Sequence, residues 1–88
     1  MPKWKDLKRF LINDHWSHVQ SRSGTDEAYQ KTLSDGTFLE TRVSRGSKEI
    51  GSGLFAKILK TQLKVSKEYF NRVLGNSKYR SDDPERRK

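Results

Sequence analysis

The chain is predicted to be one α+β domain in which a three-stranded antiparallel sheet packs against helices, in the order α-β-β-β-α-α. Apolar residues near the N-terminus recur at helical spacing, residues 16–44 contain β-type runs separated by turn signals, and two amphipathic segments follow a Gly/Ser-rich loop. With 88 residues, the chain is too short to bury a second core of its own.

The first helix is expected from Trp4 to about Asp14. At about 100° per residue its apolar residues share one face, and they are Trp4, Leu7, Phe10 and Leu11. Ile12 falls outside this stripe. His15 follows the helix and is expected in a left-handed cap, a conformation that His tolerates better than most residues.

Three strands are expected next, over Trp16 to Arg22, Ala28 to Leu33 and Thr37 to Ser44. The Asp35-Gly36 pair between the last two is a strong hairpin signal. Because side chains alternate along a strand, the third strand should point alternate residues inward, namely Leu39, Thr41 and Val43. Its outward residues would be Phe38, Glu40 and Arg42.

The second helix should run from about Gly53 to Leu63 with Ser52 as its cap. Its apolar arc contains Leu54, Phe55, Ile58, Leu59 and Leu63, and the opposite side carries Lys57, Lys60 and Lys64. A third helix, Lys67 to Leu74, is expected between a Ser66 cap and a Gly75 stop. The domain is therefore placed at residues 1–74, and residues 75–88, which lack a core pattern, are expected to form a mobile basic tail.

Composition excludes several classes of protein. The absence of cysteine excludes disulfide frameworks, thiolate zinc sites and cysteine nucleophiles. No ligand spacing indicates a metal, and no motif indicates a cofactor, so neither is predicted. No stretch resembles a signal peptide or approaches the roughly 20 apolar residues of a membrane span. We therefore expect no membrane association and a cytoplasmic location.

The formal net charge of +8 is unevenly distributed. Residues 1–41 contain six basic and six acidic side chains, whereas residues 42–74 contain eight basic and two acidic ones. This asymmetry favours binding to a polyanion, with RNA as the expected partner. The candidate nucleic-acid-binding residues are Arg42, Arg45, Lys48, Lys57, Lys60 and Lys64. A solvated helix face, or a module that binds an acidic protein, would explain the same pattern.

Three residues are candidates for acid–base chemistry. His18, on the first strand, could act as a general acid near neutral pH. Asp26 and Glu27 lie where the first two strands join. Paired carboxylates can do acid–base work, hold a divalent ion over a phosphate, or serve only as turn residues. A solvated strand histidine is the plainer interpretation of His18.

Short motifs follow one another between residues 4 and 74. They are the helix with its Asn13-Asp14-His15-Trp16 end and Val19, the Gly24-Thr25 turn, the Asp35-Gly36 hairpin, and Gly53-Leu54-Phe55-Ala56-Lys57-Ile58-Leu59-Lys60 with Leu63. This arrangement resembles the HicA family of bacterial toxins. The resemblance implies a double-stranded-RNA-binding-like fold, mRNA interferase activity, and a HicB-like antitoxin that covers the active face.

The chain departs from the family pattern at the catalytic position. HicA-like toxins carry a catalytic histidine at the start of the second strand, where this chain has Asp26 or Glu27, depending on the register. A carboxyl group supplies no proton near pH 7 unless its pKa is raised considerably. The departure predicts RNA binding with weak ribonuclease activity or none. The alternative is a metal-independent ribonuclease with Glu27 as base and His18 as acid.

Overall fold

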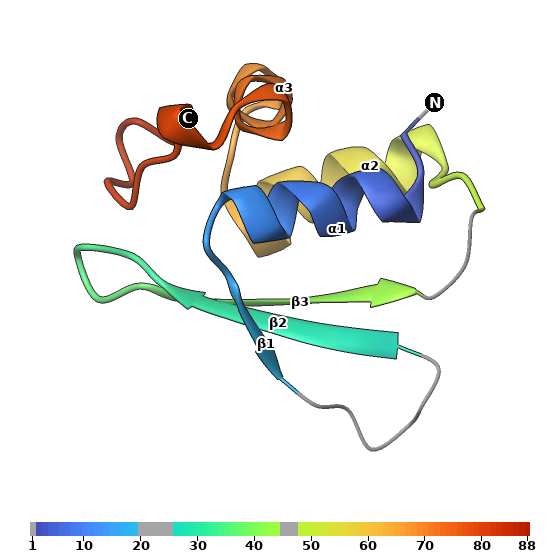
Figure 1. Cartoon of the computed structure of the whole chain (residues 1–88), viewed down its shortest axis with the longest axis horizontal. Helices are drawn as coiled ribbons and strands as arrows, with labels where there is room; N and C mark the ends of the chain where they lie inside the picture. The colour runs from blue at the N-terminus through green and yellow to red at the C-terminus, as the bar shows by residue number, and fades with distance from the viewer. Residues whose placement is uncertain (1, 20–25, 45–47) are drawn as a thin grey trace.

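The computed structural model describes residues 2–19, 26–44 and 48–88, apart from the side chain of Asp26. The elements are α1 (Trp4–Asn13), β1 (Ser17–Val19), β2 (Asp26–Thr32), β3 (Phe38–Ser44), α2 (Ser52–Lys57), the π-helix η1 (Ile58–Leu63), α3 (Lys67–Gly75) and the 3₁₀ turn η2 (Ser77–Tyr79). The predicted α+β class and element order are confirmed (Figure 1).

The sheet is antiparallel, with the strand order β1-β2-β3. Tyr29 on β2 pairs with His18 on one side and Thr41 on the other. Figure 1 shows α1, α2 and α3 on one side of the sheet, and no helix of the described residues covers its other face. Leu39, Thr41 and Val43 are buried under the helices and Phe38 is 58% exposed, which confirms the predicted phase of β3.

Helix α1 ends as its sequence predicts. His15 has a φ of 62°, its N–H donates to the Ile12 carbonyl, and the Trp16 N–H donates to the Leu11 carbonyl. These two bonds form a Schellman motif, which satisfies carbonyls that the helix leaves unpaired. The cap turns the chain sharply from α1 into β1 and leaves Asp14 fully buried.

The predicted second helix is split into two parts. The α-helical turns of α2 pass into η1, which ends at Leu63 and is followed by Lys64, a residue with a φ of 55°. Four members of the predicted apolar arc are buried, namely Phe55, Ile58, Leu59 and Leu63. Leu54 is 48% exposed, because it lies over the edge of the sheet beside Arg42 rather than over the middle of the core.

Helix α3 packs against α1 and α2 on the side away from the sheet (Figure 1). The ring centroid of Phe70 lies 4.7 Å from that of Phe10 and 5.0 Å from that of Phe55. The Asn13 side-chain amide donates to the carbonyls of Val73 and Leu74, at 3.0 and 3.2 Å. The last residue of α1 therefore caps the C-terminal end of α3.

Residues 76–88 differ from the expected tail, because the structure packs them against the domain. The side chain of Arg87 is fully buried, and its guanidinium lies 2.9 Å from Asp14 Oδ2. The main chain is held as well: the Ser34 N–H donates to the Asp82 carbonyl, and the Ser66 N–H donates to the Arg87 carbonyl. Apolar periodicity could not reveal this segment, since polar groups attach it.

Candidate functional site

Four polar side chains meet beside α1, on the side of the sheet that faces the helices. Lys8 of α1 places its Nζ 3.1 Å from Glu27 Oε2. The Tyr29 hydroxyl donates to the same oxygen at 3.3 Å. The ring of His18, across the strand pair, lies 5.1 Å from the Tyr29 ring, centroid to centroid. We call Lys8, His18, Glu27 and Tyr29 the Glu27 cluster.

The contacts within this cluster fix the charge of its carboxylate. The hydrogen bond and the charge of Lys8 hold the pKa of Glu27 below its ordinary value, against the opposing effect of burial. Burial and the neighbouring Glu27 carboxylate raise the pKa of Tyr29. Near neutral pH, an ionised carboxylate therefore lies between an ammonium group and a protonated phenol.

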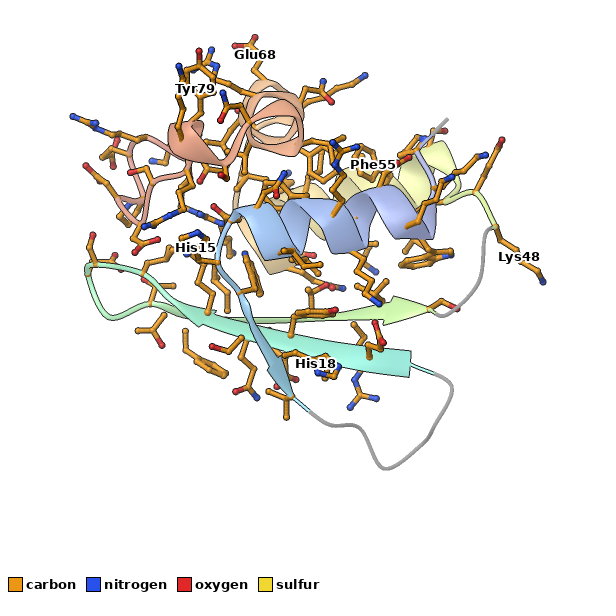
Figure 2. All side chains as sticks on the ribbon, viewed as in Figure 1. His15, His18, Lys48, Phe55, Glu68 and Tyr79 are labelled. Atoms are coloured by element: carbon orange, nitrogen blue, oxygen red, sulfur yellow. The ribbon has the colours of Figure 1, made fainter. Side chains whose placement is uncertain are left out.

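The structure brings two of the three predicted catalytic residues to one face. Tyr29 pairs directly with His18 and lies two residues from Glu27, so all three side chains project to the same side of the sheet. The His18 side chain is exposed at the edge, and Figure 2 shows it on β1, well away from His15. Asp26 begins β2, but its side chain lies outside the described residues.

The predicted lysine stripe is exposed along its whole length, on Lys57, Lys60 and Lys64. Lys60 and Lys64 line a surface hollow of about 350 Å³ together with Lys88, at the start of α3. Lys60 also borders a second hollow of about 530 Å³, which Lys67 lines too. No Asp or Glu side chain is among the residues that line the smaller hollow, although the Lys88 ammonium lies 3.4 Å from the exposed Glu85 Oε1. We call Lys57, Lys60, Lys64 and Lys88 the lysine surface.

The other predicted nucleic-acid-binding residues lie elsewhere. Arg42 belongs to the outward set of β3, and it borders a different hollow, beside Leu54. Lys48 lies before α2, near the N-terminus, where its carbonyl accepts from the Trp4 N–H (Figure 2). Arg45 lies outside the described residues. Neither lysine-lined hollow is lined by a member of the Glu27 cluster.

Three residues of these two surfaces, and Lys67 of the larger hollow, were not predicted from the sequence. Lys8 resembles an ordinary polar helix residue, and Tyr29 a core aromatic of a strand. The alternation of β2 could have linked Tyr29 to Glu27, since residues two apart share a face. Lys67 was assigned only to a helix start, and Lys88 to a mobile tail. Only the packing of the C-terminal segment shows that Lys88 lies beside Lys60 and Lys64.

Within the described part of the chain, no three His, Asp or Glu side chains are grouped so that they could hold a metal ion. Among the same residues, no helix is long and apolar enough to cross a membrane. No protein-family model matches the chain, and no curated protein or solved structure is significantly similar to it. The resemblance to HicA toxins therefore rests on the short motifs alone.

Proposed function

We propose that this chain binds RNA through the lysine surface. The observation that carries the proposal is the convergence of Lys60, Lys64 and Lys88 on one hollow that no Asp or Glu side chain lines. Ammonium groups bind phosphate as point charges and displace its counterions, without reading base sequence. The uneven distribution of the net charge adds a long-range attraction for a polyanion.

Binding through lysines predicts a steep dependence on salt. For a single strand, the slope of log affinity against log salt becomes shallower by about 0.7 for each phosphate that the protein no longer neutralises. The double variant Lys57→Ala/Lys60→Ala should therefore reduce the slope by about 1.4, measured by fluorescence anisotropy with a labelled RNA oligonucleotide. Both side chains are exposed, so the circular dichroism spectrum should not change.

The matched control is Lys5→Ala/Lys78→Ala, which removes the same charge from two exposed residues outside the lysine surface. It should leave the slope close to that of the unaltered chain. Equal slopes for the two double variants would reject the lysine surface as the binding site.

Salt-sensitive binding to poly-glutamate, without binding to RNA, would favour an acidic protein as the partner. A HicB-like antitoxin is the partner that the resemblance suggests.

A second candidate function, RNA cleavage, is favoured by the geometry of the Glu27 cluster. Cleavage without a metal needs a base to take the proton of the ribose 2′-hydroxyl and an acid to protonate the leaving 5′-oxygen. Glu27 is ionised and can serve as the base, while the exposed imidazole of His18 can serve as the acid. Attack of the 2′-oxygen on phosphorus would leave a 2′,3′-cyclic phosphate and a free 5′-hydroxyl.

Two features of the Glu27 cluster determine how fast it is expected to cleave RNA. Lys8 can stabilise the negative charge that develops on the phosphate oxygens during attack. The same ammonium lowers the pKa of Glu27, however, and a less basic carboxylate is a weaker proton acceptor. The chain should therefore be a slow ribonuclease at most, with RNA binding as its main activity.

The test is a cleavage assay of Glu27→Gln and His18→Ala, with detection of the cyclic phosphate product. Each variant should lower any cleavage by the unaltered chain about 10²-fold or more. Glu40→Gln and His15→Asn are the matched controls, and asparagine tolerates the left-handed backbone of residue 15. Cleavage that survives both cluster variants would come from another site or from a contaminating nuclease.

A further inference from the structure

Strand β3 forms one edge of the sheet and has main-chain groups left unpaired there. The Leu33 N–H donates to the Thr37 carbonyl at 2.8 Å, which fixes where the β2–β3 ladder starts. Hydrogen-bonded pairs alternate along an antiparallel ladder, so Leu39, Thr41 and Val43 bond to β2. The N–H and C=O groups of Glu40 and Arg42 therefore point to the open edge.

These outward groups have no backbone partner among the described residues. An edge strand of seven residues with free donors and acceptors is a template for pairing with another strand. The Glu40 and Arg42 side chains are both exposed, and neither forms an ion pair within the described part of the chain. Glu40 Oε2 does accept a hydrogen bond from the exposed Gln30 side-chain amide at 2.9 Å. This bond leaves the charge of Glu40 unpaired, so the main chain and the charges of both side chains are available to a partner.

The charges of β3 are complementary to those of a second copy in one register. If two copies of β3 pair antiparallel about a twofold axis at Thr41, each Glu40 lies opposite Arg42 of the other copy. A twofold axis at Glu40 would oppose two glutamates, and one at Arg42 would oppose two arginines. A twofold axis that passes between two residues of β3 would place the outward main-chain groups of one copy opposite inward groups of the other. These groups could not form the hydrogen bonds of an antiparallel ladder.

The region beside this edge is also incompletely covered. A hollow of about 380 Å³ lies along β3, lined by Glu40 and Arg42 and by Trp4, Leu54 and Ile58 from the helix layer. Leu54 is 48% exposed there, although it belongs to an apolar helix face. Pairing through β3 would bring the helix layers of two copies together across the hollow and cover this leucine.

We propose that two copies of this chain associate through β3, in antiparallel register about Thr41, to form one continuous sheet. The interface is isologous, because each copy contributes the same glutamate, arginine and free edge. Two reciprocal Glu40–Arg42 pairs fix the register, since directly opposite charges favour one alignment and like charges oppose the others. Arg42 then belongs to the association surface and not to the RNA-binding surface.

Sedimentation equilibrium of the full, nucleic-acid-free chain over a range of concentrations tests the proposal. The unaltered chain should show a reversible monomer–dimer equilibrium. Glu40→Arg or Arg42→Glu reverses both symmetry-related pairs at once, and each should weaken dimerisation about tenfold or more, which is about 1.4 kcal/mol. The double variant Glu40→Arg/Arg42→Glu exchanges the two charges and should restore the dimer.

Glu68→Arg and Arg72→Glu are the matched controls, since they make the same charge changes on exposed residues of α3. Figure 2 shows Glu68 on the far side of the helix layer from the sheet. Neither control should alter the equilibrium. A monomer at all concentrations, or a dimer insensitive to both single reversals, would overturn the proposal. Weakening in both single variants without rescue in the double would overturn the register. RNA binding is measured separately, so its failure would leave these outcomes unaffected.

Discussion

Arg87 and Asp14 form a fully buried ion pair between the C-terminal segment and the end of α1. Asp14 also accepts from the Tyr69 hydroxyl at 2.6 Å and from the Trp16 indole at 2.8 Å. The Arg87 guanidinium donates in addition to the carbonyls of Leu63 and Ser81. Arg87 Nε is buried without a hydrogen-bond partner among the described residues. A buried pair whose other hydrogen bonds are satisfied is tolerated, but removing one partner leaves an uncompensated charge in the core.

Arg87→Ala should therefore lower the free energy of unfolding by about 3–5 kcal/mol, measured by urea denaturation at pH 7. The neighbouring Arg86 is exposed, and Arg86→Ala should change stability by no more than about 0.5 kcal/mol. Equal stability of the two variants would show that the buried pair is not formed in solution. It would restore the expectation of a mobile tail.

The ion pair of Lys8 and Glu27 makes a prediction about pH. The pKa of Glu27 is lowered in the folded chain, so the pair stabilises the fold above the ordinary value of 4.5, and this stability is lost as pH falls through the lowered pKa. In Lys8→Ala, the pKa of Glu27 should rise, and this part of the acid destabilisation should shrink. Carboxyl NMR titration of Glu27 measures the shift directly. Lys5→Ala, on the exposed face of the same helix, should leave the titration unchanged.

At the scale of elements, the amphipathic helices, the cap of α3 and the strands with alternating polarity were predictable. The predicted Ser52 cap was wrong, because Ser52 lies inside α2, whose N-cap is Gly51. Ser66 does cap α3, where its hydroxyl accepts from the Tyr69 N–H, and Phe38 does point outward. The π-helical turns of η1 were not predictable, because the apolar residues of α- and π-helical turns occupy nearly the same positions over so short a segment. Two members of the Glu27 cluster, Glu27 and His18, were predicted from the sequence. Its other two members could be assigned only once the strand register and the position of α1 were known.

The burial of η1 leads to a prediction for its two adjacent residues. Leu59→Ala should lower the free energy of unfolding by about 2–5 kcal/mol, because Leu59 is 6% exposed and its truncation leaves a cavity. Lys60→Ala should stay within about 0.5 kcal/mol, since Lys60 is exposed. Thermal denaturation of both variants checks the phase of η1. A greater cost for Lys60→Ala would show that η1 is rotated relative to the core.

At the scale of the whole molecule, the lysine surface and the Glu27 cluster are built from different elements. The lysines come from α2, η1 and the C-terminal segment, whereas the cluster comes from α1, β1 and β2. RNA affinity and any cleavage should therefore respond to different substitutions. This separation allows a catalytic histidine to be tested without disturbing the proposed binding surface.

Glu27→His places an imidazole where the HicA resemblance sets the catalytic histidine. If the scaffold is HicA-like in this register, the variant should cleave RNA about 10²–10⁴-fold faster than the unaltered chain. Its RNA affinity should stay the same, because position 27 lies outside the lysine surface and a largely neutral imidazole adds little attraction for phosphate near pH 7. Asp26→His tests the neighbouring register in the same assay. Rapid cleavage by the unaltered chain, lost in Glu27→Gln, would instead establish the native carboxylate as the base. Inactivity of both histidine variants, with RNA binding intact, would limit the likeness to HicA toxins to the fold.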